Sequence, residues 1–213
     1  MQTDEFIEAL SAQLTPVKAL PAPGRRAALW LLTVTLLGAA VVARWAHLQV
    51  FAERMGSLRV ALEWLGTTLT AVSAVISAFE LSVPGASRRW LWLPLAPLAL
   101  WLAMSGWGCL ENGVGRYGAE GQMHESAHCF RFILAVSVPL AVALFAMLRR
   151  AHPIAPLPVA AYATLGVAAS AASVLQFFHP FDVTVIDLAS HLTAVAVVFA
   201  AGTALRRALL SPA

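Results

Sequence analysis

The two cysteines of the chain, Cys109 and Cys129, are the residues best suited to redox or metal chemistry. Each lies at the end of a long apolar run, and the polar segment 110–128 separates them. Two such thiols can form a structural disulfide, can sense oxidants or metal ions, or can stay unpaired and pack as small apolar side chains. The residues alone leave these alternatives open.

An imidazole next to one cysteine widens this chemistry. His128 directly precedes Cys129, and a thiolate with an imidazole is a ligand set for zinc or copper. The candidate metal ligands are therefore Cys109, Cys129 and His128, although their spacing matches no strong ligand motif. We predict no permanent cofactor, and a soft metal ion bound transiently is the ligand that these residues suggest.

Ionisable residues within or beside the apolar runs form a second group. Glu63, Asp187 and His191 fall inside runs, where a charged group is costly and usually has a partner. Asp187 and His191 are four residues apart and share a helix face. We expect a polar clamp between helices first, and support of the cysteine site second. His179, before the last run, belongs to the same supporting group because it falls on the same side as the cysteines.

Six apolar runs must position these residues. The chain is 60% hydrophobic and 12% charged, with mean hydropathy +0.76, whereas a soluble domain carries roughly 25% charge. The runs are apolar on all sides and about 20 residues long, as helices that cross a bilayer are. They cover 27–46, 59–83, 90–110, 130–148, 156–178 and 187–205. The predicted fold is an all-α, polytopic membrane protein: a tail 1–26, a six-helix bundle 27–205 and a short C-terminus 206–213.

The distribution of basic residues predicts the orientation of this bundle. Nine Lys and Arg residues fall in the termini and alternate loops, against five in the other loops. The first set is Lys18, Arg25, Arg26, Arg88, Arg89, Arg149, Arg150, Arg206 and Arg207; the second is Arg44, Arg54, Arg59, Arg116 and Arg131. The positive-inside rule then places both termini in the cytoplasm. In a bacterial inner membrane the cysteine loop faces the periplasm, an oxidising compartment. The net charge of +3 suits an anionic lipid surface and requires no nucleic acid.

The first residues of the tail predict a short amphipathic helix. Its apolar residues recur at helical spacing beside acidic ones, and the candidate binding residues are Asp4, Phe6, Ile7, Leu10 and Leu14. A short helix alone is marginal in water, so it lies on the membrane, docks into a partner or frays. Membrane-surface helices carry basic residues on their polar face, and this one carries acidic residues. The pattern therefore favours a protein partner.

Several motifs along the chain resemble those of the NrsF-type family of six-span membrane proteins. They are Thr3–Leu10, Pro16-Val17, Val83–Gly85 with Arg88–Trp90, Pro94–Trp101, Gly108-Cys109 and Glu125–Ile133. Members of this family are anti-sigma factors, negative regulators of extracytoplasmic-function (ECF) sigma factors. One element departs from the family pattern: a His-Cys-Pro-like element precedes the last span there, where this chain has Phe178-His179-Pro180.

The resemblance implies a mechanism with two ends. The N-terminal segment holds an ECF sigma factor at the membrane, and oxidative or heavy-metal stress changes the state of Cys109 and Cys129. That change repacks the bundle and releases the sigma factor. This chain lacks the third thiol of the family pattern, which argues against any mechanism that requires three thiols.

Two rival classes are less consistent with the residues. A small transporter or channel needs polar residues near the middle of several spans, whereas here the charges cluster at span ends. A membrane redox or metal-binding enzyme needs a Cys-x-x-Cys pair or a tight ligand cluster, and the sequence has neither. We therefore predict a regulator and not an enzyme, and the oligomeric state stays open.

Overall fold

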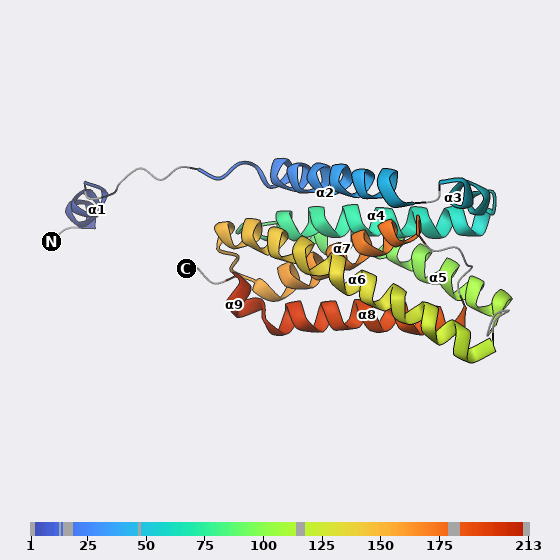
Figure 1. Ribbon diagram of the computed structural model, residues 1–213. Helices are drawn as coiled ribbons and strands as arrows, with labels where there is room; N and C mark the ends of the chain where they lie inside the picture. The colour runs from blue at the N-terminus through green and yellow to red at the C-terminus, as the bar shows by residue number, and fades with distance from the viewer. Residues whose placement is uncertain are drawn as a thin grey trace.

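The computed structural model describes residues 3–12, 14, 19–46, 48–113, 118–178 and 184–210, without the side chains of 118–125. Over these residues all regular structure is helical (Figure 1). The α-helices are α1 Thr3–Ser11, α2 Pro23–Trp45, α3 Leu48–Met55, α4 Leu58–Leu81, α5 Leu95–Asn112, α6 Gly118–Leu148, α7 Pro156–Leu175, α8 Val185–Ala204 and α9 Arg206–Leu210. Short 3-10 turns cover Arg88–Leu91 and Arg149–Ala151. Six helices are long and apolar enough to cross a membrane, which confirms the predicted all-α class with six candidate spans.

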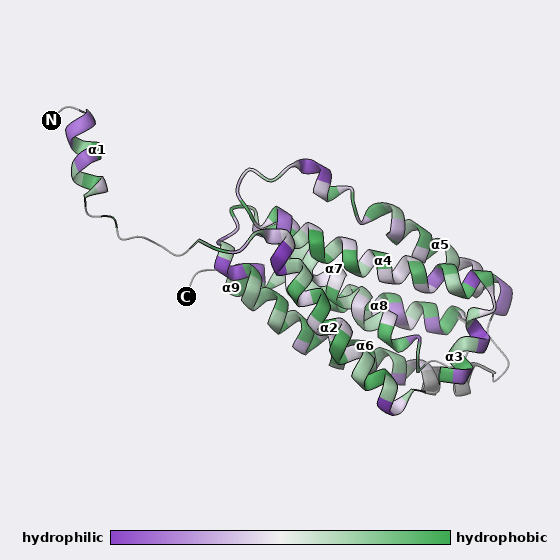
Figure 2. Ribbon diagram, turned by 90° about the horizontal axis from the view of Figure 1, so that it is seen from above, coloured by the Kyte–Doolittle hydropathy of each residue, from purple (hydrophilic) through white to green (hydrophobic). Residues whose placement is uncertain are grey.

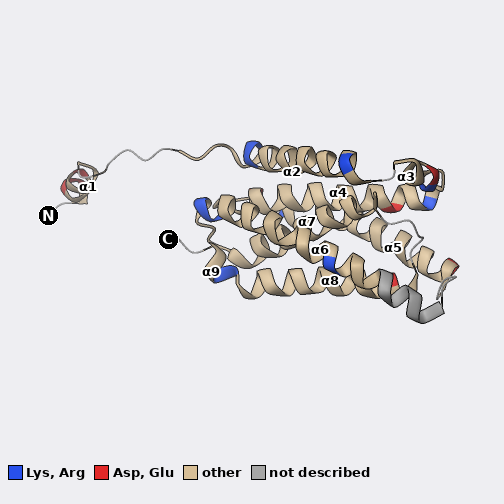
Figure 3. Cartoon of the chain, viewed as in Figure 1, with Lys and Arg blue, Asp and Glu red and all other residues tan. Residues whose placement is uncertain are grey.

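The six long helices run up and down, so that α2 and α8 bring the two ends of the bundle's chain to the same side (Figure 1). We call that side the arginine end, because arginines gather there at the start of α2, after α6 and in α9 (Figure 3). The opposite side, where α5 ends and α6 begins, is called the cysteine end. Both described termini therefore lie at one end of the bundle.

The two central helices are α4 and α7. About 61% of the span in α7 and 50% of that in α4 is buried inside the bundle, against 17% in α2 and α8. Small residues make this close packing possible. A Cβ atom added to Gly166 of α7 would lie 2.7 Å from Cγ2 of Val75 in α4. Apolar character alone marks six spans, and residue size decides which of them lie inside.

The predicted spans lie close to the helical ones, and one helix extends well beyond its span. The third span was expected at 90–110, and the apolar helical segment there is Arg88–Asn112, a 3-10 turn followed by α5. The fourth was expected from residue 130, but α6 begins at Gly118, so most of the predicted loop is helical. Ala, Glu, Gln and Met are good helix formers, and a helix is free to continue beyond the apolar segment. The helices α3 and α9 were not predicted.

The core at the arginine end holds the start of α2. Trp30 of α2 is buried with Phe79 of α4 and Leu144 of α6. The Arg26 guanidinium donates a hydrogen bond to the Met147 carbonyl and lies 5.0 Å from the centre of the Phe79 ring. Beyond Leu31, most of α2 is exposed toward the surroundings of the bundle. The helix is therefore fixed at its first turns and only loosely covered elsewhere.

Candidate functional site

The two cysteines occupy different packing environments. Cys129 of α6 is buried in an apolar cluster with Ile133 of the same helix, Leu175 of α7 and Ala194 of α8. Cys109 lies near the end of α5 and is half-buried. Both are free thiols. The structure thus assigns one thiol to α5 and the other to the junction of α6, α7 and α8.

The predicted metal ligands do not form a cluster. Among the residues that the structure describes, no group of three or more His, Cys, Asp or Glu side chains is placed to hold a metal ion. His128 is exposed, whereas the adjacent Cys129 is buried. Neighbouring residues on a helix point about 100° apart, which explains why this sequence pair does not share one site.

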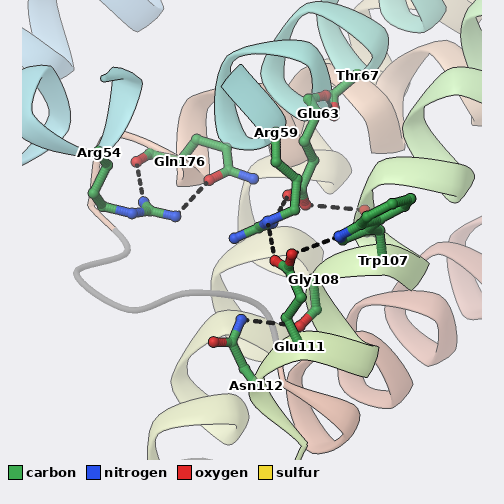
Figure 4. Close-up of polar contacts among 10 residues, drawn as sticks. Arg54, Arg59, Glu63, Thr67, Trp107, Gly108, Glu111, Asn112 and Gln176 are labelled. Atoms are coloured by element: carbon green, nitrogen blue, oxygen red, sulfur yellow. Dashed lines mark hydrogen bonds and ion pairs between the residues drawn. The ribbon is translucent and has the colours of Figure 1, made fainter. Parts of the chain in front are cut away.

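Glu63 anchors a polar network between α4 and α5 (Figure 4). Its Oε2 pairs with Arg59 Nη1 at 3.2 Å, and its Oε1 accepts a hydrogen bond from Ser105 Oγ at 2.9 Å. Arg59 Nε also pairs with Glu111 Oε2 at 3.2 Å, and Glu111 Oε1 accepts from the Trp107 indole at 2.6 Å. Glu63 is only 2% exposed, so this buried carboxylate is matched by a cation and a hydroxyl. The predicted interhelical clamp at Glu63 is confirmed.

The same network reaches the residue beside Cys109. A Cβ atom added to Gly108 would lie 2.5 Å from Arg59 Nη1, so a larger residue there would require the guanidinium to shift. The Gly108 carbonyl accepts a hydrogen bond from the Asn112 side chain at 2.9 Å (Figure 4). A change at Cys109 therefore acts one residue away from the contact between Arg59 and α5.

Asp187 anchors a second network, between α6 and α8. Its Oδ1 accepts from Ser126 Oγ at 2.5 Å and its Oδ2 from Thr184 Oγ1 at 3.1 Å. Thr184 caps α8 by accepting from the Asp187 backbone N–H at 3.3 Å, and a carboxylate in the first turn of a helix is favoured by the helix dipole. Ser190 Oγ donates to the Ser126 carbonyl at 2.8 Å. The predicted clamp at Asp187 is also confirmed.

Two histidines, His179 and His191, were predicted to support the cysteine site, and the structure describes only His191. His191 of α8 lines a small cavity together with Glu63 and Thr67 of α4 and Gln176 at the end of α7. It therefore lies beside the α4 network, as well as on the helix that carries Asp187. His179 lies outside the described residues.

An aromatic group at the cysteine end was missed by the sequence analysis. The Phe51 ring of α3 stacks on Phe177 with centroids 4.1 Å apart, and Trp64 of α4 meets both rings edge-on. Arg54 of α3 donates to the carbonyl and the side-chain oxygen of Gln176, each at 3.4 Å. The signal was present: Leu48, Phe51, Ala52 and Met55 follow helical spacing in a segment too short to span a membrane.

The N-terminal helix α1 is separate from the bundle and buries no residue (Figure 2). Its apolar residues Phe6, Ile7 and Leu10 are 48%, 57% and 51% exposed. Asp4 and Glu5 lie in its first turn, where they favour the helix dipole. Leu14 was expected to continue the stripe, but it lies beyond the end of the helix at Ser11 and is 75% exposed. The structure thus presents an apolar stripe that nothing in the described chain covers.

These observations define a helical protein with six candidate membrane spans and an exposed amphipathic helix before them. The family model described as "NrsF: Negative regulator of sigma F" matches residues 10–211. The chain belongs to this family of negative regulators of a sigma factor, as its motifs predict. No curated protein and no solved structure matches the chain.

Proposed function

We propose that this protein is an anti-sigma factor that holds an ECF sigma factor on α1, at the cytoplasmic face of a bacterial inner membrane. Its family supplies negative regulation of a sigma factor. The observation that carries the proposal is the exposed stripe of Phe6, Ile7 and Leu10. An uncovered apolar face on a short helix is stabilised by docking into a groove of a partner.

The charge of α1 indicates the chemistry of that partner. Asp4, Glu5 and Glu8 are exposed beside the stripe, and α1 carries no basic residue. An acidic amphipathic helix is repelled by an anionic leaflet and attracted by a groove with basic edges. Arginines also gather at the start of α2, the next helix in the chain (Figure 3). By the positive-inside rule they support a cytoplasmic location for α1.

We further propose that Cys109 and Cys129 are the sensing end. Joining the thiols as a disulfide removes two protons and two electrons, which a thiol oxidant accepts; a soft metal ion would instead bridge two thiolates. Cys109 belongs to the α4–α5 side of the bundle and Cys129 to the α6–α8 side. A bond between them would link α5 to α6, and we expect the change to shift α4 and α6, helices that contact α2, which follows α1 in the chain.

The docking proposal is tested by a double variant, Phe6→Ser with Leu10→Ser, in a cell that carries a sigma-dependent reporter. We expect the reporter to rise to the level seen without the regulator, and sigma factor to be lost from the purified complex. Ala9→Ser is the matched control, because Ala9 is an exposed residue of α1 outside the stripe. Full repression by a protein lacking residues 3–11 would contradict the docking role.

The sensing proposal is tested by Cys109→Ser and Cys129→Ala, made singly. Each variant should keep repression in unstressed cells and lose induction by oxidant or heavy metal. Alkylation after denaturation should label both cysteines of protein from unstressed cells and neither cysteine of protein from stressed cells. An unchanged induction in both variants would leave the thiols as packing residues only.

A further inference from the structure

Two arginine pairs from distant parts of the chain lie close together at the arginine end (Figure 3). The Arg26 guanidinium of α2 donates to the carbonyl of Met147, which is 121 residues away near the end of α6. Arg149 and Arg150 follow α6 directly in a 3-10 turn, and Arg25 precedes Arg26 in the first turn of α2. We call these four arginines the arginine cluster.

The positive charge of the arginine cluster is not balanced within the described part of the bundle. None of its members forms an ion pair with another described residue. One carboxylate lies near: a Cβ atom added to Gly24 would be 3.7 Å from Glu80 Oε1. The charge of Arg150 repels that of Arg26, which is only 6% exposed. Like charges held together repel more strongly away from water, so a bound anion would stabilise this arrangement.

The side chains of the arginine cluster indicate which anion would bind. Arg25, Arg149 and Arg150 are exposed and can contact a ligand, whereas the buried Arg26 adds charge and holds the end of α6 in place. A guanidinium presents a planar fork of N–H donors that matches the oxygens of a phosphate or carboxylate. The acidic helix α1 does not supply such a group, because it is separate from the bundle (Figure 2).

The position of the arginine cluster favours the phosphate of a lipid. The cluster lies at the ends of two candidate spans, Pro23–Trp45 and Ser126–Ala151. Leu29 follows Arg25 by four residues on the same face of α2 and is 60% exposed, and Val142 of α6 is 65% exposed. Exposed apolar residues thus follow the arginines along both helices, as acyl chains follow a headgroup. Basic pockets between spans on the cytoplasmic side bind anionic headgroups.

We propose that the arginine cluster binds the phosphate group of an anionic phospholipid in the cytoplasmic leaflet. The guanidiniums of Arg25, Arg149 and Arg150 contact the phosphate oxygens. The bound phosphate offsets the repulsion within the cluster and links the start of α2 to the end of α6. This inference rests on the proposed membrane location and orientation, and it does not depend on sigma binding.

Native mass spectrometry of the full-length protein in mild nonionic detergent tests the site. The protein is titrated with dioleoyl phosphatidylglycerol, which is anionic, and with dioleoyl phosphatidylcholine, which has no net charge. We expect the wild type to retain the anionic lipid in preference. The double variant Arg149→Gln with Arg150→Gln should weaken that retention about ten-fold or more, since it removes hydrogen bonds between charged groups. Both residues are exposed, so the variant should fold, which circular dichroism checks.

The matched control is the double variant Arg88→Gln with Arg89→Gln. It also removes an exposed arginine pair from a 3-10 turn, in the connection between α4 and α5. We expect it to change retention by about two-fold or less, the effect of an exposed charge outside the site. Arg25→Gln, on the other helix of the site, should weaken retention about five-fold.

Equal losses in the two double variants would show a diffuse attraction by net charge and would overturn the proposal. Equal retention of the two lipids by the wild type would overturn it too. Inorganic phosphate in large excess should leave the lipid bound; displacement of the lipid would assign the site to free phosphate instead.

Extraction of cell membranes with alkaline carbonate is measured in parallel. A protein that stays in the membrane but does not prefer the anionic lipid overturns this inference alone. A protein that is washed off the membrane overturns the proposed location as well.

Discussion

We call the contact between two packed helices a seam. The α4–α5 seam and the α6–α8 seam each bury one carboxylate in the half of the bundle toward the cysteine end, and different groups bind the two carboxylates. Glu63 is held by the Arg59 cation and the Ser105 hydroxyl. Asp187 accepts from two hydroxyls, those of Ser126 and Thr184, and lies in the first turn of α8. An ion pair thus contributes to the first seam, and two hydroxyls and a helix N-terminus contribute to the second.

This difference sets how each seam responds to change. Removing a cation from a buried pair leaves a charge that the interior does not solvate, whereas removing one of several neutral donors weakens a hydrogen bond. The α4–α5 seam also contacts Gly108, beside Cys109, through Arg59. We therefore expect this seam to be the more sensitive one, and the α6–α8 seam, which packs beside Cys129, to be the more tolerant.

Arg59→Met is expected to have the largest effect. It removes the cation that pairs with the buried Glu63 carboxylate and should lower the free energy of unfolding by about 3 kcal/mol. Unfolding in detergent, followed by circular dichroism, measures it. The double variant Arg59→Met with Glu63→Gln should recover much of the loss, since no uncompensated charge remains. If Arg59→Met alone were as stable as the wild type, the α4–α5 seam would not be the more sensitive of the two.

Gly66→Ala tests the closeness of the same seam without changing a charge. The added Cβ would lie 2.8 Å from the Trp101 backbone nitrogen, and backbone does not yield as a flexible side chain does. We expect a loss of about 2 kcal/mol, the usual effect of overpacking. Gly106→Ala is the control on α5, because nothing lies within 4 Å of its added Cβ. Equal stabilities for the two variants would contradict close packing here.

Asp187→Asn should have a smaller effect on the α6–α8 seam. The amide nitrogen cannot accept from a hydroxyl, so one hydrogen bond and the favourable charge at the start of α8 are lost. The expected loss is about 1–2 kcal/mol. The same unfolding measurement applies, and a loss as large as that of Arg59→Met would show that the two carboxylates are equally sensitive.

Ser190→Ala should have the smallest effect. It removes the hydrogen bond from Ser190 to the Ser126 carbonyl between α8 and α6, worth about 0.5–1 kcal/mol in a partly buried position. Thr193→Ala on the same helix is the control, since its hydroxyl donates only within α8, to the Ala189 carbonyl. A larger loss in Thr193→Ala than in Ser190→Ala would show that the bond between the helices is not what stabilises the seam.

The spans were predictable because the relevant signal is local. Apolar runs of about 20 residues are read directly from the sequence, and a helix satisfies its backbone within the run. The ends were less predictable, since α6 continues through polar residues as far as Gly118. The helix α3 was missed because its apolar spacing occupies only two turns between two spans.

By itself, the sequence determined the class of the protein, the positions of its six long helices, the exposed acidic helix α1 and, through its motifs, the family. Only the tertiary structure decided that α4 and α7 are central, and that Glu63 meets Ser105 and Asp187 meets Ser126, residues 42 and 61 positions apart. It also separated the two thiols into different environments. Helix formation depends on neighbours along the chain, whereas partners across a seam depend on how side-chain shapes pack in three dimensions.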